Sequence, residues 1–418
     1  MALNLTRRHF LTASAIVAGT SLLTTKVSAG IKPLTGKILG VSTLDPLDGS
    51  TELSKIVELD LASGEVNYFD LPDHRFGHSL VSLNEGGYLA VPYGDDDVAC
   101  LFLDQSYRPI ADIKAPPGYG FGGHAVLTPD GRHIFTHFNR ATYDDKRQPH
   151  QTGQYCVIDV AERKVVKTGS TNILHGHDIL LTRDRKQIVI GDDGTLETRF
   201  GDILKSAASP FALVPGNPQL VAFDVDSFAL NKAIALEING AMVHIAEAND
   251  GQIVGAVEQF VANSEAGYAA LGALLGEDTP KYVEQLDETL VKLGIELPFP
   301  GPIVSVNLAK GTTEEVMSPV HQMPFDIMRN KETGRVLNVF TASHMLSRFD
   351  PARNRWGYFQ TSIFGIKQPY GLTDIPGTTL MAVNGFMDGI AVFDTLTMAL
   401  VKKFDSKNFG IKHLQYVA

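Results

Sequence analysis

Short apolar runs recur along the chain between turn-forming residues, a pattern that predicts many β-strands. Seven of these runs begin at a matching register, and five of the seven carry a histidine there. The seven starts are Gly77–Val81, Gly123–Leu127, Gly176–Leu180, Val243–Ala246, Phe325–Met328, Tyr370–Thr373 and Lys412–Tyr416. This recurrence predicts one repeating unit whose innermost strand brings its first residues to a common axis.

A second marker runs in step with the first: an apolar run that ends in Asp or Asn and is followed by turn residues. Its copies are Val57–Asp60, Leu101–Asp104, Cys156–Asp159, Val221–Asp224, Val304–Asn307, Ser347–Asp350 and Ala391–Asp394. An Asp or Asn side chain can bond the backbone two residues on, which suits a tight turn between antiparallel strands. Repeats of four short strands are typical of β-propellers. We therefore predict an all-β, seven-bladed β-propeller over residues 30–418.

The seventh blade needs strands from both ends of the chain. We number the blades from blade one, which starts at His78, to blade seven, which starts at His413 and has only five residues after that histidine. The N-terminal runs Lys37–Thr43, Lys55–Asp60 and Val66–Leu71 lack an inner strand of their own. We expect them to pair with the C-terminal strand, which would close the ring and remove its exposed edges.

The connection between the second and third strands is long in three blades. It is expected at Asn139–Gly153, Asp192–Pro218 and Asn249–Gly301, on the same rim as the histidines. In blade four a cap-and-proline start precedes Lys281–Leu293, and a glycine follows, so we predict a helical insertion at 251–301. That insertion is either a decorated loop on its own blade or a lid or partner-docking arm.

The N-terminus resembles a twin-arginine export signal. Thr6–Leu11 contains an Arg-Arg pair and precedes an apolar run from Leu11 to Leu23, and Val27–Ala29 fits a cleavage site. The run is shorter than the ~20 residues that a membrane span needs. We therefore expect residues 1–29 to be a signal peptide, and the mature protein to be periplasmic without a membrane span.

Net charge limits the kinds of binding partner that we expect, and the cysteine positions bear on disulfide formation. The formal net charge is −11, and loss of residues 1–29, with three basic and no acidic residues, would make it −14. Such an acidic protein is not expected to bind nucleic acid. The only two cysteines, Cys100 and Cys156, fall on equivalent strands of consecutive repeats, and we expect buried thiols, with a disulfide as the alternative.

The histidines at the inner-strand starts are the best candidates for chemistry. In blade order they are contiguous around the axis, with an aspartate next, and the predicted metal ligands are His413, His78, His124, His177, His244 and Asp326. Imidazole with carboxylate suits iron, zinc or copper. His175, Asp178, Asp192 and Asp193 are candidate supporting groups or additional ligands. Two other interpretations are a structural hydrogen-bond network and a wet channel that binds nothing in particular.

Two segments carry a family resemblance. Gly122–Arg132, and Gly176–Asp178 followed by Gln187–Ile190, resemble a family of twin-arginine-exported bacterial propellers of unknown function that accompany imelysin-type iron-uptake proteins. The resemblance implies a propeller fold and matches His78, His124, His177 and His244 to that family's inner-strand histidines. The chain departs from the pattern by its Gly-His-Asp segment and by its insertion. A looser likeness, at the level of the fold, is to periplasmic zinc-chaperone propellers.

These observations favour a periplasmic propeller that binds a transition metal, iron or zinc, for metal uptake or handling. Its partners would be the metal ion or a small molecule, and another periplasmic metal-uptake protein. One alternative is a metal-dependent enzyme, an oxidoreductase or a lactonase-like hydrolase. The other is a metal-free interaction scaffold that docks partners through the blade-four insertion.

Overall fold

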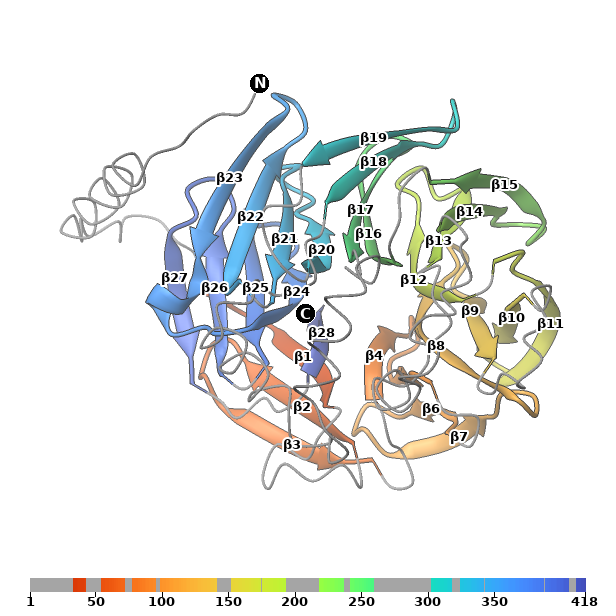
Figure 1. Cartoon of the computed structure of the whole chain (residues 1–418). Coiled ribbons are helices and arrows are strands. Elements are labelled where there is room, and N and C mark those ends of the chain that lie inside the picture. The colour runs from red at the N-terminus through yellow and green to blue at the C-terminus, as the bar shows by residue number, and fades with distance from the viewer. Residues whose placement is uncertain are drawn as a thin grey trace, which may run out of the picture. The chain divides into compact units, whose positions relative to one another are not determined.

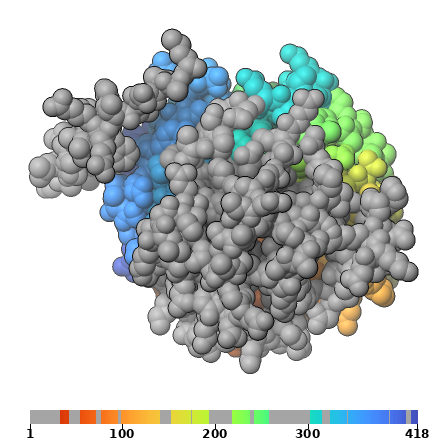
Figure 2. Space-filling view, in the orientation of Figure 1, coloured from red at the N-terminus to blue at the C-terminus, as the bar shows by residue number. Residues whose placement is uncertain are grey.

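Seven four-stranded antiparallel sheets follow one another in chain order around a ring (Figure 1). In the space-filling view the described residues appear at the margin in colours from blue through green to orange (Figure 2). The computed structural model describes residues 33–42, 54–71, 77–94, 98–140, 152–173, 175–192, 218–236, 241–258, 302–317, 324–341, 343–386, 388–405 and 411–418. The chain divides into Met1–Thr35 and Gly36–Ala418, and every strand belongs to the second unit. The predicted seven-bladed β-propeller is therefore confirmed.

Each blade contributes four strands. From blade seven through blade one to blade six, the inner strands are β28 (Ile411–Val417), β4 (Gly77–Ser82), β8 (Tyr119–Leu127), β12 (Gly176–Leu181), β16 (Ala241–Asn249), β20 (Pro324–Arg329) and β24 (Pro369–Asp374). The second strands are β1 (Lys37–Ser42), β5 (Tyr88–Pro92), β9 (His133–Arg140), β13 (Gln187–Asp192), β17 (Gln252–Glu258), β21 (Val336–Phe340) and β25 (Leu380–Gly385). The third strands are β2 (Lys55–Asp60), β6 (Cys100–Leu103), β10 (Gln154–Asp159), β14 (Gln219–Asp224), β18 (Ile303–Asn307), β22 (Met345–Asp350) and β26 (Ile390–Asp394). The outer strands are β3 (Val66–Asp70), β7 (Pro109–Ile113), β11 (Lys164–Ser170), β15 (Leu230–Ala235), β19 (Thr312–Met317), β23 (Arg355–Gln360) and β27 (Leu400–Phe404).

The two ends of the second unit close the ring in blade seven, as the sequence predicts. Strand β28 pairs antiparallel with β1, and the register places Lys37 opposite Val417. Each inner strand contacts the inner strands of both neighbouring blades, from β28 through β4 to β24 and back to β28. The starts of the seven inner strands therefore meet around one axis.

The turn markers work through their side chains. In six of the seven turns the Asp or Asn accepts a hydrogen bond from a main-chain N–H two or three residues on, as from Ser63 to Asp60 at 2.7 Å. The seventh, Asp350, instead pairs with Arg335 and Arg353. Most bonds reach three residues on rather than the expected two, because the turns contain one more residue.

The core lies between neighbouring blades, where the middle strands bury apolar side chains on both faces. One such cluster joins blades one and two and contains Cys100 and Cys156, together with Phe102, Phe121 and Phe138. Both thiols are buried and unpaired, so the expectation of buried thiols is confirmed. The faces that pack between blades thus hold the inner strands in register with one another.

The blade-four insertion begins later than predicted. Residues 252–258 form β17, the second strand of the blade, so the predicted lower bound at 251 is wrong. The helix expected at Lys281–Leu293 lies outside the described residues. Within the described part of the chain the only helix is the one-turn 3-10 helix η2 (Thr361–Phe364), and no helix there is long and apolar enough to cross a membrane.

Candidate metal centre

A break in strand pairing recurs at the first residues of the inner strands. In every blade the register between the inner and second strands shifts there, for example between Gly77 and Ser79 in β4 and between Gly176 and Ile179 in β12. A β-bulge re-aims a side chain that regular pairing would hold on the sheet face. These bulges turn the residues of the repeated register toward the axis.

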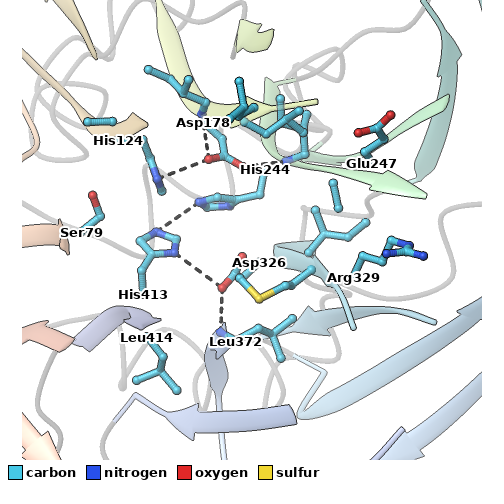
Figure 3. A pocket seen from close by; sticks show the side chains of 18 of the residues that line it. Ser79, His124, Asp178, His244, Glu247, Asp326, Arg329, Leu372, His413 and Leu414 are labelled. Atoms are coloured by element: carbon cyan, nitrogen blue, oxygen red, sulfur yellow. Dashed lines mark hydrogen bonds and ion pairs between the residues drawn. The ribbon is translucent and has the colours of Figure 1, made fainter. Parts of the chain in front are cut away.

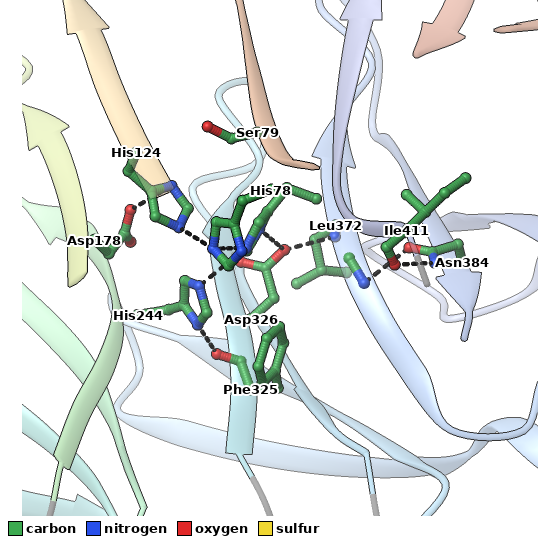
Figure 4. Close-up of polar contacts among 12 residues, drawn as sticks. His78, Ser79, His124, Asp178, His244, Phe325, Asp326, Leu372, Asn384 and Ile411 are labelled. Carbon is green, nitrogen blue, oxygen red and sulfur yellow. Dashed lines mark hydrogen bonds and ion pairs between the residues drawn. The ribbon is translucent and has the colours of Figure 1, made fainter. Parts of the chain in front are cut away.

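Four of the predicted ligands come together at the axis. One ring nitrogen each of His78, His124, His244 and His413 lies within 4.8 Å of the other three. Figure 4 shows His78, His124 and His244 of this group. The Nε2 atoms form a chain, with His124 to His78 at 3.0 Å, His78 to His413 at 3.1 Å and His413 to His244 at 3.2 Å. We call these four residues the histidine cluster. They come from blades one, two, four and seven.

Three rings of the histidine cluster are held from behind by oxygen atoms. His124 Nδ1 lies 3.3 Å from Asp178 Oδ1, and His413 Nδ1 lies 3.6 Å from Asp326 Oδ2. His244 Nδ1 makes a short hydrogen bond to the main-chain carbonyl of Phe325. This is the arrangement that fixes metal-binding histidines, because an acceptor at Nδ1 leaves the Nε2 lone pair pointing at the ion.

Both carboxylates are themselves positioned by the neighbouring blade. Asp178 Oδ2 accepts the main-chain N–H of Ile245 at 2.9 Å, and Asp326 Oδ2 accepts that of Leu372 at 2.7 Å. Each aspartate therefore ties its own inner strand to the next one and orients a histidine at the same time. The support of the histidine cluster is built into the contacts that hold the ring together.

When His244 and His413 are both neutral, the contacts behind their rings leave lone pairs facing each other. The carbonyl of Phe325 can only accept, so the proton of neutral His244 sits on Nδ1 and its Nε2 carries a lone pair. In neutral His413 the carboxylate of Asp326, 3.6 Å from Nδ1, favours the proton on that nitrogen and a lone pair on Nε2. The two Nε2 atoms nevertheless lie 3.2 Å apart. A cation bound by both nitrogens would turn this repulsion into attraction.

Burial keeps three histidines of the cluster in the form that binds metal. Desolvation, and then the neighbouring imidazoles, hold the pKa values of His78 and His124 well below the usual range. Desolvation, and then repulsion between protons on His244 and on His413, lower the pKa of His244 to about 3. Because only neutral imidazole can bind a metal ion, these three residues can bind one at neutral pH without losing protons.

The two aspartates respond differently to burial. Burial, aided by the charge of Asp326, raises the pKa of Asp178 to about 8. Burial also acts to raise the pKa of Asp326, but the contact and charge of His413 outweigh it and lower that pKa. A divalent cation among four neutral imidazoles would offset the negative charge that both carboxylates carry when ionised.

The spacing of the nitrogens indicates which ions fit. Two nitrogen ligands at about 2.1 Å from a metal are about 3.0 Å apart at a right angle and about 3.4 Å apart in a tetrahedron. Two of the observed Nε2 pairs, at 3.0 and 3.1 Å, fall nearer the right angle, and the third, at 3.2 Å, lies midway. Right angles suit iron or copper and leave coordination positions vacant, whereas zinc with four protein ligands would form a closed tetrahedral site.

The other predicted residues lie around the histidine cluster, and ligation by any of them stays a prediction. The His177 ring packs edge-on at 4.9 to 5.3 Å from the rings of His78 and His244, but the residue is not one of the four that converge. Asp326 supports His413 as described. Asp192 Oδ1 accepts the main-chain N–H of His175 at 3.2 Å, and Asp193 lies outside the described residues.

A cavity of about 340 Å³ adjoins the histidine cluster (Figure 3). Three of the four histidines line one end of it, together with Asp178 and Asp326, and the middle is largely aliphatic. The other end is lined by Arg183, Glu247, Arg329 and Lys331, which lie at the far ends of the inner strands. The cavity therefore runs away from the rim where the long connections were expected, toward the opposite rim. No pattern in the sequence predicts this cavity.

Comparison with known proteins supports the fold. A search of family models and a search of curated proteins found no match to this chain. Among solved structures, hydrazine synthase of Kuenenia stuttgartiensis is similar with a TM-score of 0.56 at 11% identity, over 90% of this chain and 99% of that one. An apocarotenoid oxygenase of Synechocystis has a TM-score of 0.55 at 11% identity, over 93% of each chain. The dihydro-heme d1 dehydrogenase NirN in complex with DHE has a TM-score of 0.53 at 10% identity, over 93% of this chain and 77% of that one.

The chain is thus a seven-bladed β-propeller with four histidines that could hold a metal ion. Identities of 10 to 11% show a shared fold and nothing finer. The resemblance to the imelysin-associated family has no support from a family model.

Proposed function

We propose that the histidine cluster holds one resident transition-metal ion, and that this ion is the redox centre of an oxidoreductase. The observation that carries the proposal is the approach of the Nε2 atoms of His244 and His413 to 3.2 Å, with His244 Nδ1 bonded to the Phe325 carbonyl and His413 Nδ1 3.6 Å from Asp326 Oδ2. Only a proton or a metal ion between the nitrogens relieves that contact. Four converging nitrogens with oriented rings favour the metal ion.

Two features favour a redox metal with a vacant position over a closed site. The near-right-angle spacing of the nitrogens leaves room for a small molecule on the ion, and the cavity gives that molecule a place. A bound redox ion can exchange electrons with a molecule held beside it. Two of the similar folds are named as an oxygenase and a dehydrogenase, but the proposal rests on the site and not on that likeness.

The burial of the histidine cluster favours a resident ion over metal uptake or handling, the function that the sequence favours. His78 and His244 are each 1% exposed and His124 is 9% exposed. A protein that hands metal on needs ligands that a partner can reach, whereas these are enclosed by the blades. A resident ion that exchanges slowly is therefore the form of metal binding that we propose, with iron or copper ahead of zinc.

Metal content and ligand access test this proposal together. The full chain, produced in medium containing iron, copper and zinc, should purify with about one metal ion that survives brief treatment with a chelator. Azide added to the cupric form, or nitric oxide added to the ferrous form, should change its electron paramagnetic resonance spectrum because a position is vacant. His413→Ala should lose the ion, while His133→Ala, which changes a histidine outside the cluster, should keep it. Rapid, complete removal by the chelator would favour handling over catalysis.

We also propose export by the twin-arginine pathway, on the strength of the sequence of residues 1–29, which lie outside the described residues. Cell fractionation tests it directly. The native chain should reach the periplasm, and a variant with both Arg7→Lys and Arg8→Lys should stay in the cytoplasm. Equal periplasmic amounts of the two proteins would contradict the proposal.

A further inference from the structure

The cavity beside the histidine cluster has two chemically different ends joined by an apolar wall (Figure 3). The inner end is formed by the histidines and the two aspartates. The middle is lined by aliphatic side chains from all seven blades, including Leu180, Ala246, Met328, Leu372 and Leu414. The outer end carries three basic residues and one acidic residue. A molecule that fills the cavity therefore needs an apolar body and one polar end.

The charges at the outer end are not equally available. Arg183 Nη1 pairs with Asp250 at 2.8 Å, and this pair is largely exposed. Glu247 is buried and accepts main-chain N–H groups with both oxygens, from Arg183 and from Gly251. Lys331 is exposed at the surface. The acidic residue is thus already bonded to the protein, and Arg183 already has a counter-ion.

Arg329 is different. It is partly buried on β20, and its Nε atom is buried with no hydrogen-bond partner. Burial and the charge of Arg183 act to lower its pKa, whereas Glu247, Asp374 and Asp250 act to raise it. A carboxylate or phosphate satisfies a guanidinium best through two parallel hydrogen bonds. Because Arg329 lines the cavity, the ligand that we assign to it is an anion that enters from the cavity.

The distance between the ends sets the size of the molecule. Asp326 and Arg329 are three residues apart on β20, which is about 10 Å along an extended strand. The outer rim is formed by the hairpin turns after β12, β16 and β20, all of which are described. The extended chain of octanoate would span this distance with its head at Arg329 and its tail at the histidine cluster.

We infer that the cavity binds an anionic amphiphile, with the anionic head on Arg329 and the apolar body along the aliphatic wall toward the histidine cluster. This inference deepens the proposed function, because it names the substrate class of the same site. The head group is a carboxylate or a phosphate, which share the chemistry that the guanidinium recognises. No step of a reaction is assigned to the bound molecule.

Calorimetric titration of the full chain with octanoate, octyl phosphate and octanol tests the inference. One of the two anions should bind more tightly than octanol, and the tighter one identifies the head group. Arg329→Met should weaken anion binding by about 10- to 100-fold, the range of a lost charge-assisted hydrogen bond, and leave octanol unchanged. Arg329→Lys should recover part of the loss. Arg355→Met is the matched control, because Arg355 is an exposed arginine on β23 of the same blade.

The titrations are carried out on metal-free and on metal-loaded protein, which separates this inference from the proposed function. In copper-loaded protein the methyl signal of bound octanoate should broaden more than the signal of the carbon next to the carboxylate. Anion binding by metal-free protein would support the inference even where no metal binds. Equal affinity of wild type and Arg329→Met, or stronger broadening at the carboxylate end, would overturn it, whatever the metal content.

Discussion

Two sets of buried histidines lie close together in this propeller, and they differ in what their ring nitrogens contact. In the histidine cluster, three of the four Nδ1 atoms face an oxygen from a neighbouring strand and all four Nε2 atoms converge. In the second set, both ring nitrogens of His137 and Nε2 of His177 are buried without a hydrogen-bond partner. All of these residues except His413 are buried, so burial alone does not identify a metal ligand.

The difference lies in the contacts behind the ring. His137 fills a space beside Gly122 and Gly176, where neither glycine leaves room for a side chain. Packing contacts hold the His137 ring, whereas oxygen atoms near Nδ1 orient the rings of His244 and His413. A histidine held by packing alone can be replaced by another group of similar shape. A histidine oriented by an acceptor at Nδ1 can bind a metal ion through Nε2.

Removing one histidine whose Nδ1 atom contacts an acceptor should have the largest effect on metal affinity. His244→Ala leaves three nitrogens and breaks the contact with Phe325, so we expect metal affinity to fall by more than about 100-fold. The metal content of purified protein, measured by mass spectrometry, checks this. His137→Ala, a buried histidine from the second set, is the matched control and should keep the metal. Loss of metal in both variants alike would erase the distinction between the two sets.

Removing the charge behind a ligand should have a smaller effect. Asp326→Asn keeps the shape of the side chain but weakens the hold on His413 Nδ1, and we expect metal affinity to drop by about 10- to 100-fold. Competition with a chromophoric chelator measures the change. Asp130→Asn tests the specificity, because Asp130 contacts His133, a histidine outside the cluster. An Asp326→Asn variant with native affinity would show that His413 needs no oriented proton.

The pH dependence of the free energy of unfolding also tests the description of His137 as a buried, neutral histidine. Burial lowers the pKa of His137 to about 4, although the nearby backbone of Gly176 opposes the shift. The unfolded chain takes up a proton near pH 6.5 and the folded chain does not, so stability is lost as the pH falls below 6.5. Between pH 7.5 and pH 5 this one group should destabilise the metal-free protein by about 2 kcal/mol.

Denaturant unfolding of His137→Asn tests whether His137 causes this loss of stability. The variant should lose about 2 kcal/mol less than the wild type over the same pH interval, because it lacks the titrating ring. Its metal content at pH 7.5 should equal that of the wild type. An unchanged pH dependence would mean that His137 is protonated in the folded protein.

The smallest effect should come from the backbone behind the cluster. Gly123 has φ of 90°, and a Cβ there would lie 2.5 Å from His78 Cδ2. Gly123→Ala should displace His78 and weaken metal binding by about fivefold, besides the strain of a left-handed alanine. Gly251→Ala has the same kind of strain, with φ of 67°, but meets no atom within 4 Å. It should lower stability by about 1 kcal/mol and leave metal affinity unchanged.

The fold could be predicted because its signals are local. Apolar runs that end in Asp60 and its equivalents mark each blade, and the short segment after His413 predicts closure with the N-terminal strands. The repeated register of the histidines likewise predicted that they meet at one axis. These features need only the period of the repeat and the chemistry of the turns.

The positions of the site residues depend on the β-bulges, which no sequence pattern predicts. A shift between Gly176 and Ile179 places Asp178 against His124, while His177 packs on the cluster without joining it. Asp326, also a predicted ligand, lies 3.6 Å from Nδ1 of His413, and its ligation of a metal stays a prediction. No sequence pattern marks Arg329, because the cavity that it lines is formed by inner strands of different blades.

X-ray absorption at the metal edge of the purified full chain tests the central claim most directly. We expect about one ion with four imidazole nitrogens at about 2.0 to 2.2 Å, and a coordination number above four from a further light atom. A protein that purifies metal-free from replete medium, with His413 carrying protons on both nitrogens by NMR, would contradict the account, because a proton would then occupy the place assigned to the metal.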